Sequence, residues 1–128
     1  MSLKVEVKPG EKLLVGNSVI TNGDQRIRIF IEGKAPILRE KDILTPETAD
    51  SPARRIYFAV QLMYLHEDTV SLRGEYFQLV NDIVKAAPST IPYVDAINNE
   101  ILTGSLYKAM KAAGQLIRYE QELLANAK

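Results

Sequence analysis

A short run near the start of the chain decides the fold: Lys8-Pro9-Gly10-Glu11-Lys12-Leu13-Leu14-Val15-Gly16-Asn17. Its first and last pairs, Pro9-Gly10 and Gly16-Asn17, are turn signals, because proline presets φ and glycine accepts a positive φ. The apolar residues between them have the length and composition of a short strand. The run therefore predicts a strand bracketed by two turns, and with it a β-rich beginning of the chain.

Outward from this run, apolar residues recur with period two from Leu3 to Leu44. Asn22-Gly23 is a strong hairpin signal, since both residues tolerate the positive φ of a type I′ turn. It is expected to join a strand over 19–21 to a return strand over 25–31. Residues 1–45 are thus predicted to form a meander of short antiparallel strands, ending with Ile37-Leu38-Arg39.

The return strand has two different faces. Side chains alternate along a strand, so one face carries isoleucines and the other carries Arg26, Arg28 and Phe30. We expect the isoleucine face to lie on the core. Two guanidinium groups and an aromatic ring would then stand on the opposite face.

From residue 46 the periodicity becomes helical. Ser51-Pro52 is an N-cap and first-turn pair for a helix that ends between 65 and 67. Further helices are expected over 70–86, from the Pro88 to Pro92 break to 102, and over 105–127. The apolar stripe predicted for the last helix is Leu106, Met110, Ala113, Ile117 and Leu124.

The expected fold class is therefore α+β, a small antiparallel sheet followed by about four helices. Two modules follow from it, 1–45 and 46–128. Their junction is too short for a free linker, so the helical module is expected either to pack on the first or to serve in partner binding and oligomerisation.

Composition sets outer bounds. Lysine and arginine total 16 and so do aspartate and glutamate, so the net charge exerts no global attraction to nucleic acid. There is no cysteine, and no apolar run is long enough to cross a membrane. We expect a cytoplasmic protein with no cofactor and no membrane association, and homo-oligomers are compatible with this composition.

Catalytic signals are weak. The single histidine lies in His66-Glu67-Asp68 at a predicted helix end, where a solvated surface is the favoured interpretation over a metal or a general base. The sequence has no phosphate-binding glycine loop and no nucleophile motif. The protein is expected not to be an enzyme.

The basic residues of the β module admit two interpretations. The side chains of Lys4, Lys8, Arg26, Arg28 and Arg39 could bind phosphates and stack on bases, with Phe30 as a further stacking surface. Alternatively, they form the solvated side of a half-covered sheet, paired with Glu6, Glu32 and Glu40. Pattern alone favours the second interpretation.

The chain resembles the FlbT family of bacterial regulators of flagellum biosynthesis. The residues that carry the likeness are the run Leu3 to Asn17, Ile20-Thr21-Asn22-Gly23-Asp24-Gln25-Arg26, Phe30-Ile31-Glu32-Gly33, Ala35-Pro36-Ile37-Leu38-Arg39-Glu40 and Gln61-Leu62-Met63-Tyr64-Leu65. The resemblance implies binding to the 5′ untranslated region of flagellin mRNA, repression of its translation and promotion of its decay. It also implies a link to FlaF and to flagellin itself.

The opening run and Leu38-Arg39-Glu40 are also similar in type and spacing to the CsrA family of small RNA-binding regulators. That likeness implies RNA contacts at Lys8 and Arg39, and an interlocked β dimer. This chain has Val7-Lys8 where CsrA proteins have two arginines, and Leu38 where they have histidine. The helical module has no CsrA counterpart.

Two hypotheses follow. In the first, the protein is an RNA-binding repressor that uses Arg39, Lys8, Arg26, Arg28 and Lys4. In the second, it is an adaptor whose helical module binds FlaF or flagellin and affects the mRNA indirectly.

Overall fold

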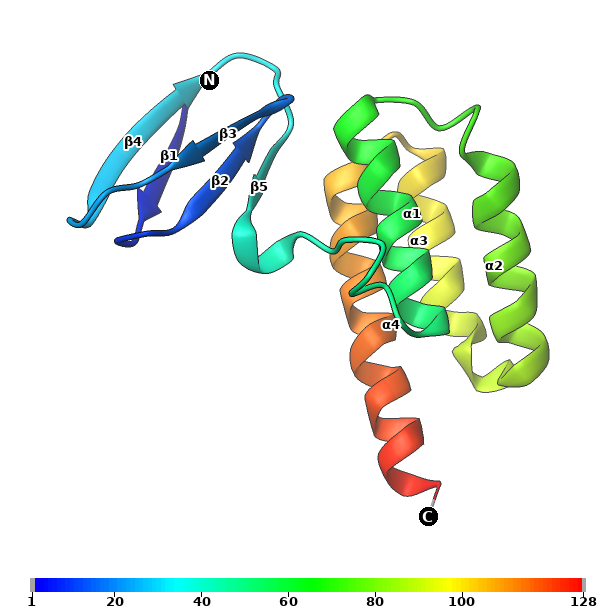
Figure 1. The fold of residues 1–128 in the computed structure, drawn as a ribbon. Helices are drawn as coiled ribbons and strands as arrows, with labels where there is room; N and C mark the ends of the chain where they lie inside the picture. The colour runs from blue at the N-terminus through cyan, green and yellow to red at the C-terminus, as the bar shows by residue number, and fades with distance from the viewer. Residues whose placement is uncertain (1, 128) are drawn as a thin grey trace. The chain divides into compact units, whose positions relative to one another are not determined.

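A computed structural model describes residues 2–127, and the chain divides into two compact units between Ile43 and Leu44. We call residues 2–43 the β unit and residues 44–127 the helical unit (Figure 1). Strands come first and helices second, which confirms the α+β class. The boundary predicted from the sequence lies two residues later, after residue 45.

All strands in the described part of the chain belong to the β unit and are antiparallel. β1 pairs with β4 in a two-stranded sheet, and β2 lies between β3 and β5 in a three-stranded sheet. A short 3-10 turn, η1 (Glu40–Asp42), follows β5. The strands are β1 (Ser2–Val7), β2 (Lys12–Val15), β3 (Ser18–Thr21), β4 (Ile27–Glu32) and β5 (Ile37–Arg39).

The first four strands form one long, kinked hairpin. β2 and β3 meet at the two-residue turn Gly16-Asn17, where Gly16 has a φ of 63°. Beyond Lys12↔Thr21 the pairing resumes at Val7↔Ile27, so one strand has moved five residues and the other six. One strand therefore has one residue more than its partner, as in a β-bulge, and a β-bulge bends the pair of strands. The hairpin therefore folds at its middle and its two halves are assigned to separate sheets.

Asn22-Gly23 is not the hairpin turn that the sequence predicted. β3 and β4 are not paired with each other, and neither Asn22 nor Gly23 has a positive φ. Instead both residues lie at the kink, where the Gly10 N–H donates to the Gly23 carbonyl at 2.8 Å. Of the neighbour pairings that a meander implies, only that of β2 with β3 is present.

The side chain of Asn22 explains why the predicted turn gives way. It is buried, and its amide nitrogen donates to the carbonyls of Val7, Lys8 and Gln25 at 3.0, 2.9 and 2.7 Å. These carbonyls lie at the kink, where the strand pairing is interrupted, and a buried carbonyl without a partner is costly. A side chain that satisfies all three outweighs the local turn preference of the dipeptide.

The core of the β unit lies between the halves of the folded hairpin. Val5, Val7 and Leu13 are buried there, and half-buried side chains from β2, β4 and β5 pack against them. Ile29 and Ile31 belong to that second group while Phe30 between them is 64% exposed, as the predicted alternation requires. Ile27, at the kinked end of β4, is 41% exposed and covers the core only in part.

Four helices make up the described helical unit, and each was expected. The first begins at Pro52 with Ser51 as its N-cap, whose hydroxyl accepts the Arg54 N–H at 3.1 Å. Their bounds are α1 (Pro52–His66), α2 (Arg73–Ala86), α3 (Ile91–Leu102) and α4 (Leu106–Asn126), with the 3-10 turn η2 (Pro88–Thr90) before α3. The second helix starts three residues later than predicted.

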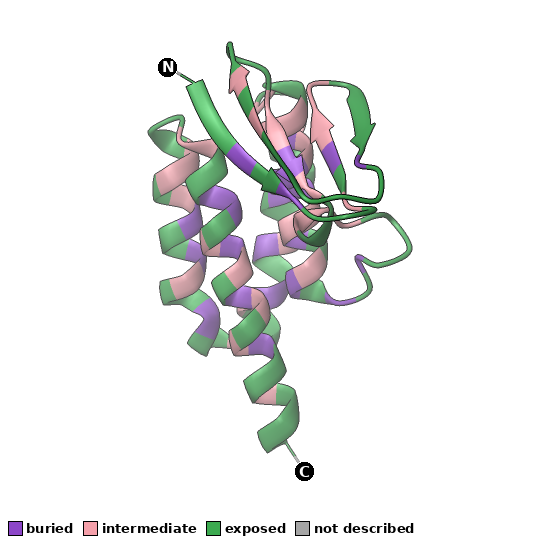
Figure 2. Ribbon diagram, turned by 90° about the vertical axis from the view of Figure 1, so that its left-hand side faces the viewer, coloured by how far each residue is buried: buried purple, intermediate pink, exposed green. Residues whose placement is uncertain are grey.

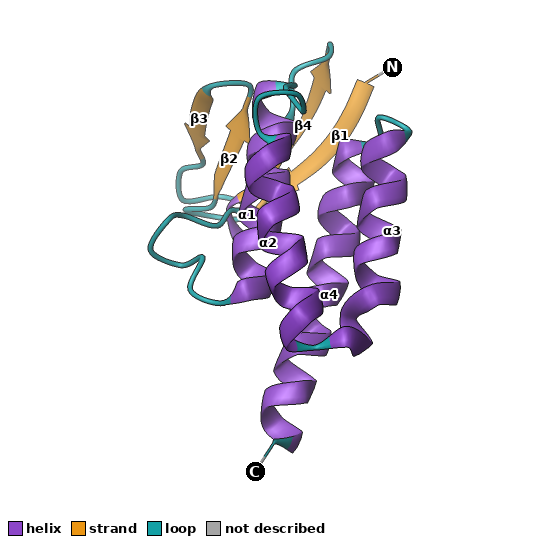
Figure 3. Cartoon of the chain, turned by 90° about the vertical axis from the view of Figure 1, so that its right-hand side faces the viewer, coloured by secondary structure: helices purple, strands orange, loops and turns teal. Residues whose placement is uncertain are grey.

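Within the helical unit, α1 contacts α2 and α4, and α4 contacts α3 as well. Successive helices run in opposite directions, with connections at alternating ends (Figure 3). Buried residues lie on the inward sides of these helices (Figure 2). Between α2 and α3, the buried Tyr76 hydroxyl donates to Asn98 Oδ1 at 2.6 Å, and burial raises the pKa of this phenol.

The buried stripe of α4 differs from the predicted one. Met110 and Ala113 are buried as expected, but Leu124 is 64% exposed. Because α4 is covered by α1 on one side and by α3 on the other, its inward face centres on small residues that allow close approach. The buried residues are Ala109, Met110, Ala113, Leu116 and Glu120.

Glu120 is buried because it caps another helix. Its Oε1 accepts the Ser51 hydroxyl at 2.6 Å and its Oε2 accepts the Ala53 N–H at 2.9 Å. The N-terminus of a helix has unpaired N–H groups and a partial positive charge, both of which favour a carboxylate. A charged residue in the middle of an apolar stripe thus has a specific partner.

Candidate nucleic-acid interface

The side of the β1–β4 ribbon away from the core is the candidate surface. Register places Lys4 opposite Phe30 and Glu6 opposite Arg28, and opposite residues in antiparallel strands share a face. Phe30 has 64% of its surface exposed. We call this surface the ribbon face; its residues are Lys4, Glu6, Arg26, Arg28, Phe30 and Glu32.

Glu6 lies at the centre of the ribbon-face charges. Its carboxylate is 3.7 Å from the Arg26 guanidinium and 3.6 Å from that of Arg28. All three side chains are more than half exposed, so water screens these pairs and each contributes only about 0 to 1 kcal/mol. The two arginines are therefore held near each other by contacts that another anion could replace.

Arg39 lies in a different set of contacts. It donates from Nη2 to the backbone carbonyl of Glu6 on β1 and to the Glu11 carboxylate, the latter at 3.4 Å. The Lys8 N–H, and after it the Arg39 guanidinium, hold the pKa of the Glu11 carboxyl below its ordinary value of 4.5. Arg39 thus fastens β5 to β1 and joins the two sheets of the β unit.

The five predicted RNA-contact residues therefore fall into two groups. Lys4, Arg26 and Arg28 share the ribbon face around Glu6, whereas Lys8 and Arg39 lie around Glu11. Within residues 2–127 the ammonium groups of Lys4 and Lys8 form no ion pair. Their roles in RNA binding stay predictions.

The residues that organise these groups were not predicted from the sequence. Glu6 was foreseen only as a surface counter-charge, and Glu11 and Asn22 were not considered as side-chain partners. For Glu6 a signal existed, since a glutamate among cations of an expected sheet favours a cross-strand pair. The Glu11 and Asn22 contacts depend on the kink, which local patterns do not reveal.

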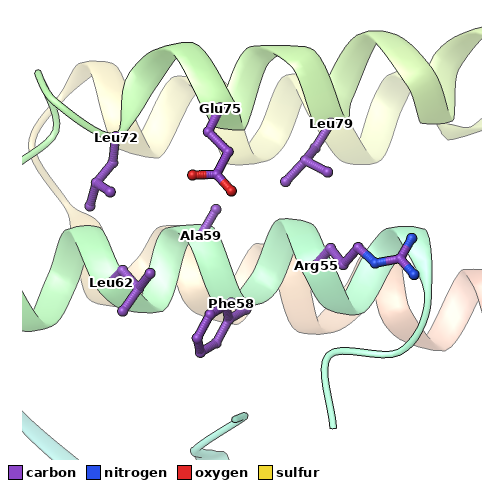
Figure 4. Close-up of a pocket in the computed structure, with 7 residues that line it drawn as sticks. All are labelled: Arg55, Phe58, Ala59, Leu62, Leu72, Glu75 and Leu79. Atoms are coloured by element: carbon purple, nitrogen blue, oxygen red, sulfur yellow. The ribbon is translucent and has the colours of Figure 1, made fainter. Parts of the chain in front are cut away.

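The helical unit contains a groove between α1 and α2 with a volume of about 110 Å³. Glu75 points from α2 towards Ala59 of α1, between Leu72 and Leu79 (Figure 4). Arg55, Phe58 and Leu62 line the α1 side. Typical small-molecule sites enclose roughly 300 to 1,000 Å³, so this groove is small for such a ligand.

The His66-Glu67-Asp68 segment forms a helix end. Glu67 has a left-handed φ of 52° just after α1. Asp68 accepts the Ser71 hydroxyl and the N–H groups of Ser71 and Val70, which together hold the pKa of its carboxyl below 3.8. Nowhere in residues 2–127 do three metal-ligating side chains gather.

One end of the helical unit has several exposed apolar side chains. The α1–α2 and α3–α4 connections both lie at this end (Figure 1). The ring centroids of Tyr64 and Tyr107 are 5.8 Å apart there. Val70 and Leu102 are 76% and 83% exposed there, and Tyr107 is 44% exposed. Grouped exposed apolar side chains are typical of protein contact surfaces.

No helix within residues 2–127 is long and apolar enough to cross a membrane. No solved structure matches the chain.

Comparison with known proteins gives consistent results. Residues 3–124 match the family described as "Flagellar protein FlbT". A relative from Bradyrhizobium diazoefficiens, "Probable flagellum biosynthesis repressor protein FlbT 1", is 60% identical over 96% of this chain and 85% of its own length. A relative from Rhodopseudomonas palustris, "Probable flagellum biosynthesis repressor protein FlbT", is 48% identical over 98% of this chain and 99% of its own length. The "Flagellum biosynthesis repressor protein FlbT" of Caulobacter vibrioides is 36% identical over 98% of this chain and 92% of its own length.

Proposed function

Because the chain belongs to the FlbT family, whose named relatives are repressors of flagellum biosynthesis, we propose that it represses flagellum synthesis by binding the 5′ untranslated region of flagellin mRNA through its ribbon face. Bound there, the protein blocks ribosome entry and promotes decay of the message. The proposal needs no catalytic group.

One observation carries this proposal: an exposed aromatic ring stands on a strand between cations. Phe30 lies opposite Lys4 and two residues from Arg28, with most of its surface free. Proteins that bind single-stranded RNA stack unpaired bases on such rings and neutralise the adjacent phosphates with lysine and arginine. The face therefore combines the two kinds of contact that this recognition needs.

The charge balance of the face sets the character of the binding. Three cations and two carboxylates leave it only weakly positive. Stacking, more than phosphate attraction, must then supply the affinity, and the salt dependence of binding is expected to be shallow. A loop or another unpaired segment of the leader is the expected target, since only unpaired bases can stack on Phe30.

The test is RNA binding by Phe30→Ala. Removing the ring is expected to weaken binding to a flagellin leader RNA by about 1 to 3 kcal/mol, the cost of losing one base stack. Phe77→Ala is the matched control, because Phe77 is also exposed but lies on α2. Equal affinity of both variants and the wild type, measured by fluorescence anisotropy, would refute the assignment to the ribbon face.

Substituting one cation from each group provides a second test of RNA binding. Lys4→Ala is expected to reduce both the affinity and the salt slope, because Lys4 has no ion partner to release. Arg39→Ala tests the prediction from the CsrA resemblance. Arg39 also joins β5 to β1, so Arg39→Ala could weaken RNA binding by destabilising the fold. Thermal unfolding of the variant, followed by circular dichroism, distinguishes this effect from the loss of an RNA contact.

A second candidate function is an adaptor that binds FlaF or flagellin through the apolar end of the helical unit. The exposure of Val70 and Leu102 at that end favours it, as does the net charge of zero. Purified protein that co-elutes with flagellin or FlaF but does not retain leader RNA would support the adaptor over the RNA-binding repressor. Val70→Ser with Leu102→Ser should then abolish this co-elution.

A further inference from the structure

The second strand of the kinked hairpin, residues 18–32, has an unusual outer edge. β3 and β4 each have a partner on one side only, so both leave a row of backbone groups without a strand partner. Four large apolar residues on this strand are exposed. They are Val19, Ile20, Ile27 and Phe30, whose exposed fractions are 63%, 43%, 41% and 64%. Unpaired edges with apolar side chains are templates for another strand.

Edges that must stay single carry protective features, such as an inward-pointing charge, a proline or a very short strand. β4 has six residues, its inward side chains are isoleucines, and it contains no proline. β3, by contrast, has only four residues. β4 is therefore the longer of the two edges, and its outward-facing charges, Arg28 and Glu32, are opposite in sign.

The sequence of β4 is complementary to itself. If two copies align antiparallel about Phe30, Ile29 of one lies opposite Ile31 of the other. In the same alignment Arg28 lies opposite Glu32, and by symmetry this pair occurs twice. Odd-numbered residues of β4 face the core, so the alignment keeps both cores on the same side of the joined sheet.

We propose that two copies of this chain associate through their β4 edges, antiparallel about Phe30, to form a continuous four-stranded sheet β1–β4–β4–β1. The association would extend the two-stranded β1–β4 sheet to four strands and would pair the edge of β4 that has no strand partner. The occupant is a second copy because opposite charges then meet at both ends of the alignment. This inference does not depend on RNA binding.

Association would also double the ribbon face. Two Phe30 rings and two sets of Lys4, Arg26 and Arg28 would lie on one sheet, related by a two-fold axis. Each chain could then contact one of two RNA segments. Dimer formation, however, is to be measured without RNA, so its failure and a failure of the proposed function remain separate results.

The register is tested by disulfide trapping, which is clean here because the chain has no cysteine. Phe30→Cys places two thiols directly opposite each other, at a separation that permits a disulfide. A mild oxidant should convert most of this variant to a covalent dimer at micromolar concentration. Val19→Cys, equally exposed but on β3, should stay monomeric. Trapping of Val19→Cys without trapping of Phe30→Cys would overturn the β4 alignment.

The charge pairs are tested by Glu32→Arg, which would place arginine opposite Arg28 at both ends. Light scattering of the wild type should give twice 14.3 kDa at high concentration. The variant should dissociate at about tenfold higher concentration, because two cross-strand attractions become repulsions. Glu47→Arg, the same change on an exposed residue of the helical unit, should have no effect. A wild type of 14.3 kDa at every concentration would refute the proposal.

Discussion

The two units of this chain solve the problem of stability in different ways. Of the buried hydrophobic residues described, only Val5, Val7, Leu13 and Leu38 belong to the β unit, and fifteen belong to the helical unit. The β unit relies on polar side chains that reach across it, namely Asn22, Arg39 and Glu11. The helical unit relies mainly on its core, with Glu120 as an internal polar contact.

This difference relates to function. Side chains that form a core are not available for binding. A small sheet that is joined by polar contacts leaves the side chains of one face free for that purpose. The ribbon face lies on the unit with the smaller core. If the two units differ in this way, the same kind of truncation should destabilise the β unit more than the helical unit.

The largest expected effect is a matched truncation in both cores. Leu13 and Leu116 are 1% and 0% exposed, and Leu→Ala at such sites costs about 2 to 5 kcal/mol. A unit of this size rarely has more than about 3 to 5 kcal/mol from its core, so Leu13→Ala should abolish hydrogen-exchange protection throughout the β unit. Leu116→Ala should weaken the helical unit without unfolding it. Equal behaviour of the two units would contradict the contrast.

A smaller effect is expected for the polar contact of the helical unit. Glu120→Ala leaves the N-terminus of α1 without its buried carboxylate and should cost about 1 to 3 kcal/mol. Glu122→Ala, an exposed glutamate on the same helix, is the control. Urea unfolding followed by circular dichroism measures both. A Glu120→Ala midpoint equal to that of the control would show that the cap contributes nothing.

The polar contacts of the β unit should respond to pH. The folded-state pKa of Glu11 is lowered, so its contribution is complete above its ordinary value of 4.5 and is lost as the pH falls through the folded value. Glu11→Gln should therefore lower the melting temperature of the β unit at pH 7. The difference from wild type should shrink below pH 4.5. A difference that is independent of pH would rule out the Glu11 carboxylate as the cause.

The smallest expected effect is that of Glu6→Gln. The ion pairs of Glu6 with Arg26 and Arg28 are exposed and long, so stability should change by no more than about 0.5 kcal/mol. Leader RNA should nevertheless bind this variant more tightly, since the two arginines lose a competing anion. A large loss of stability would place Glu6 among the structural contacts of the β unit, beside Glu11.

The fold was predictable where local chemistry decides it. All four helices were expected, because caps such as Ser51-Pro52 and apolar periodicity are encoded in neighbouring residues. The strands were expected for the same reason. Their pairing was not, because the kink depends on the Asn22 side chain reaching carbonyls up to fifteen residues away. The stripe of α4 was misplaced because a buried Glu120 looks polar in sequence.

The candidate site follows the same rule. Strand alternation correctly placed Phe30 on the exposed face and Ile29 and Ile31 on the inner one, whereas Ile27 is 41% exposed. It could not show that Arg39 would contact Glu11 and the Glu6 carbonyl, since that requires knowing that β5 lies beside β2 and near β1. Arg39, to which the CsrA resemblance assigned an RNA contact, thus has its guanidinium group engaged within the fold.

The Glu120 cap also constrains how the protein is made. Ser51 and Glu120 are separated by 69 residues, so the ribosome must synthesise most of the helical unit before α1 receives its buried carboxylate. Until residue 120 emerges, the first turn of α1 has only Ser51 and water as partners. The helical unit therefore closes late in synthesis, after the β unit has been free to fold on the nascent chain.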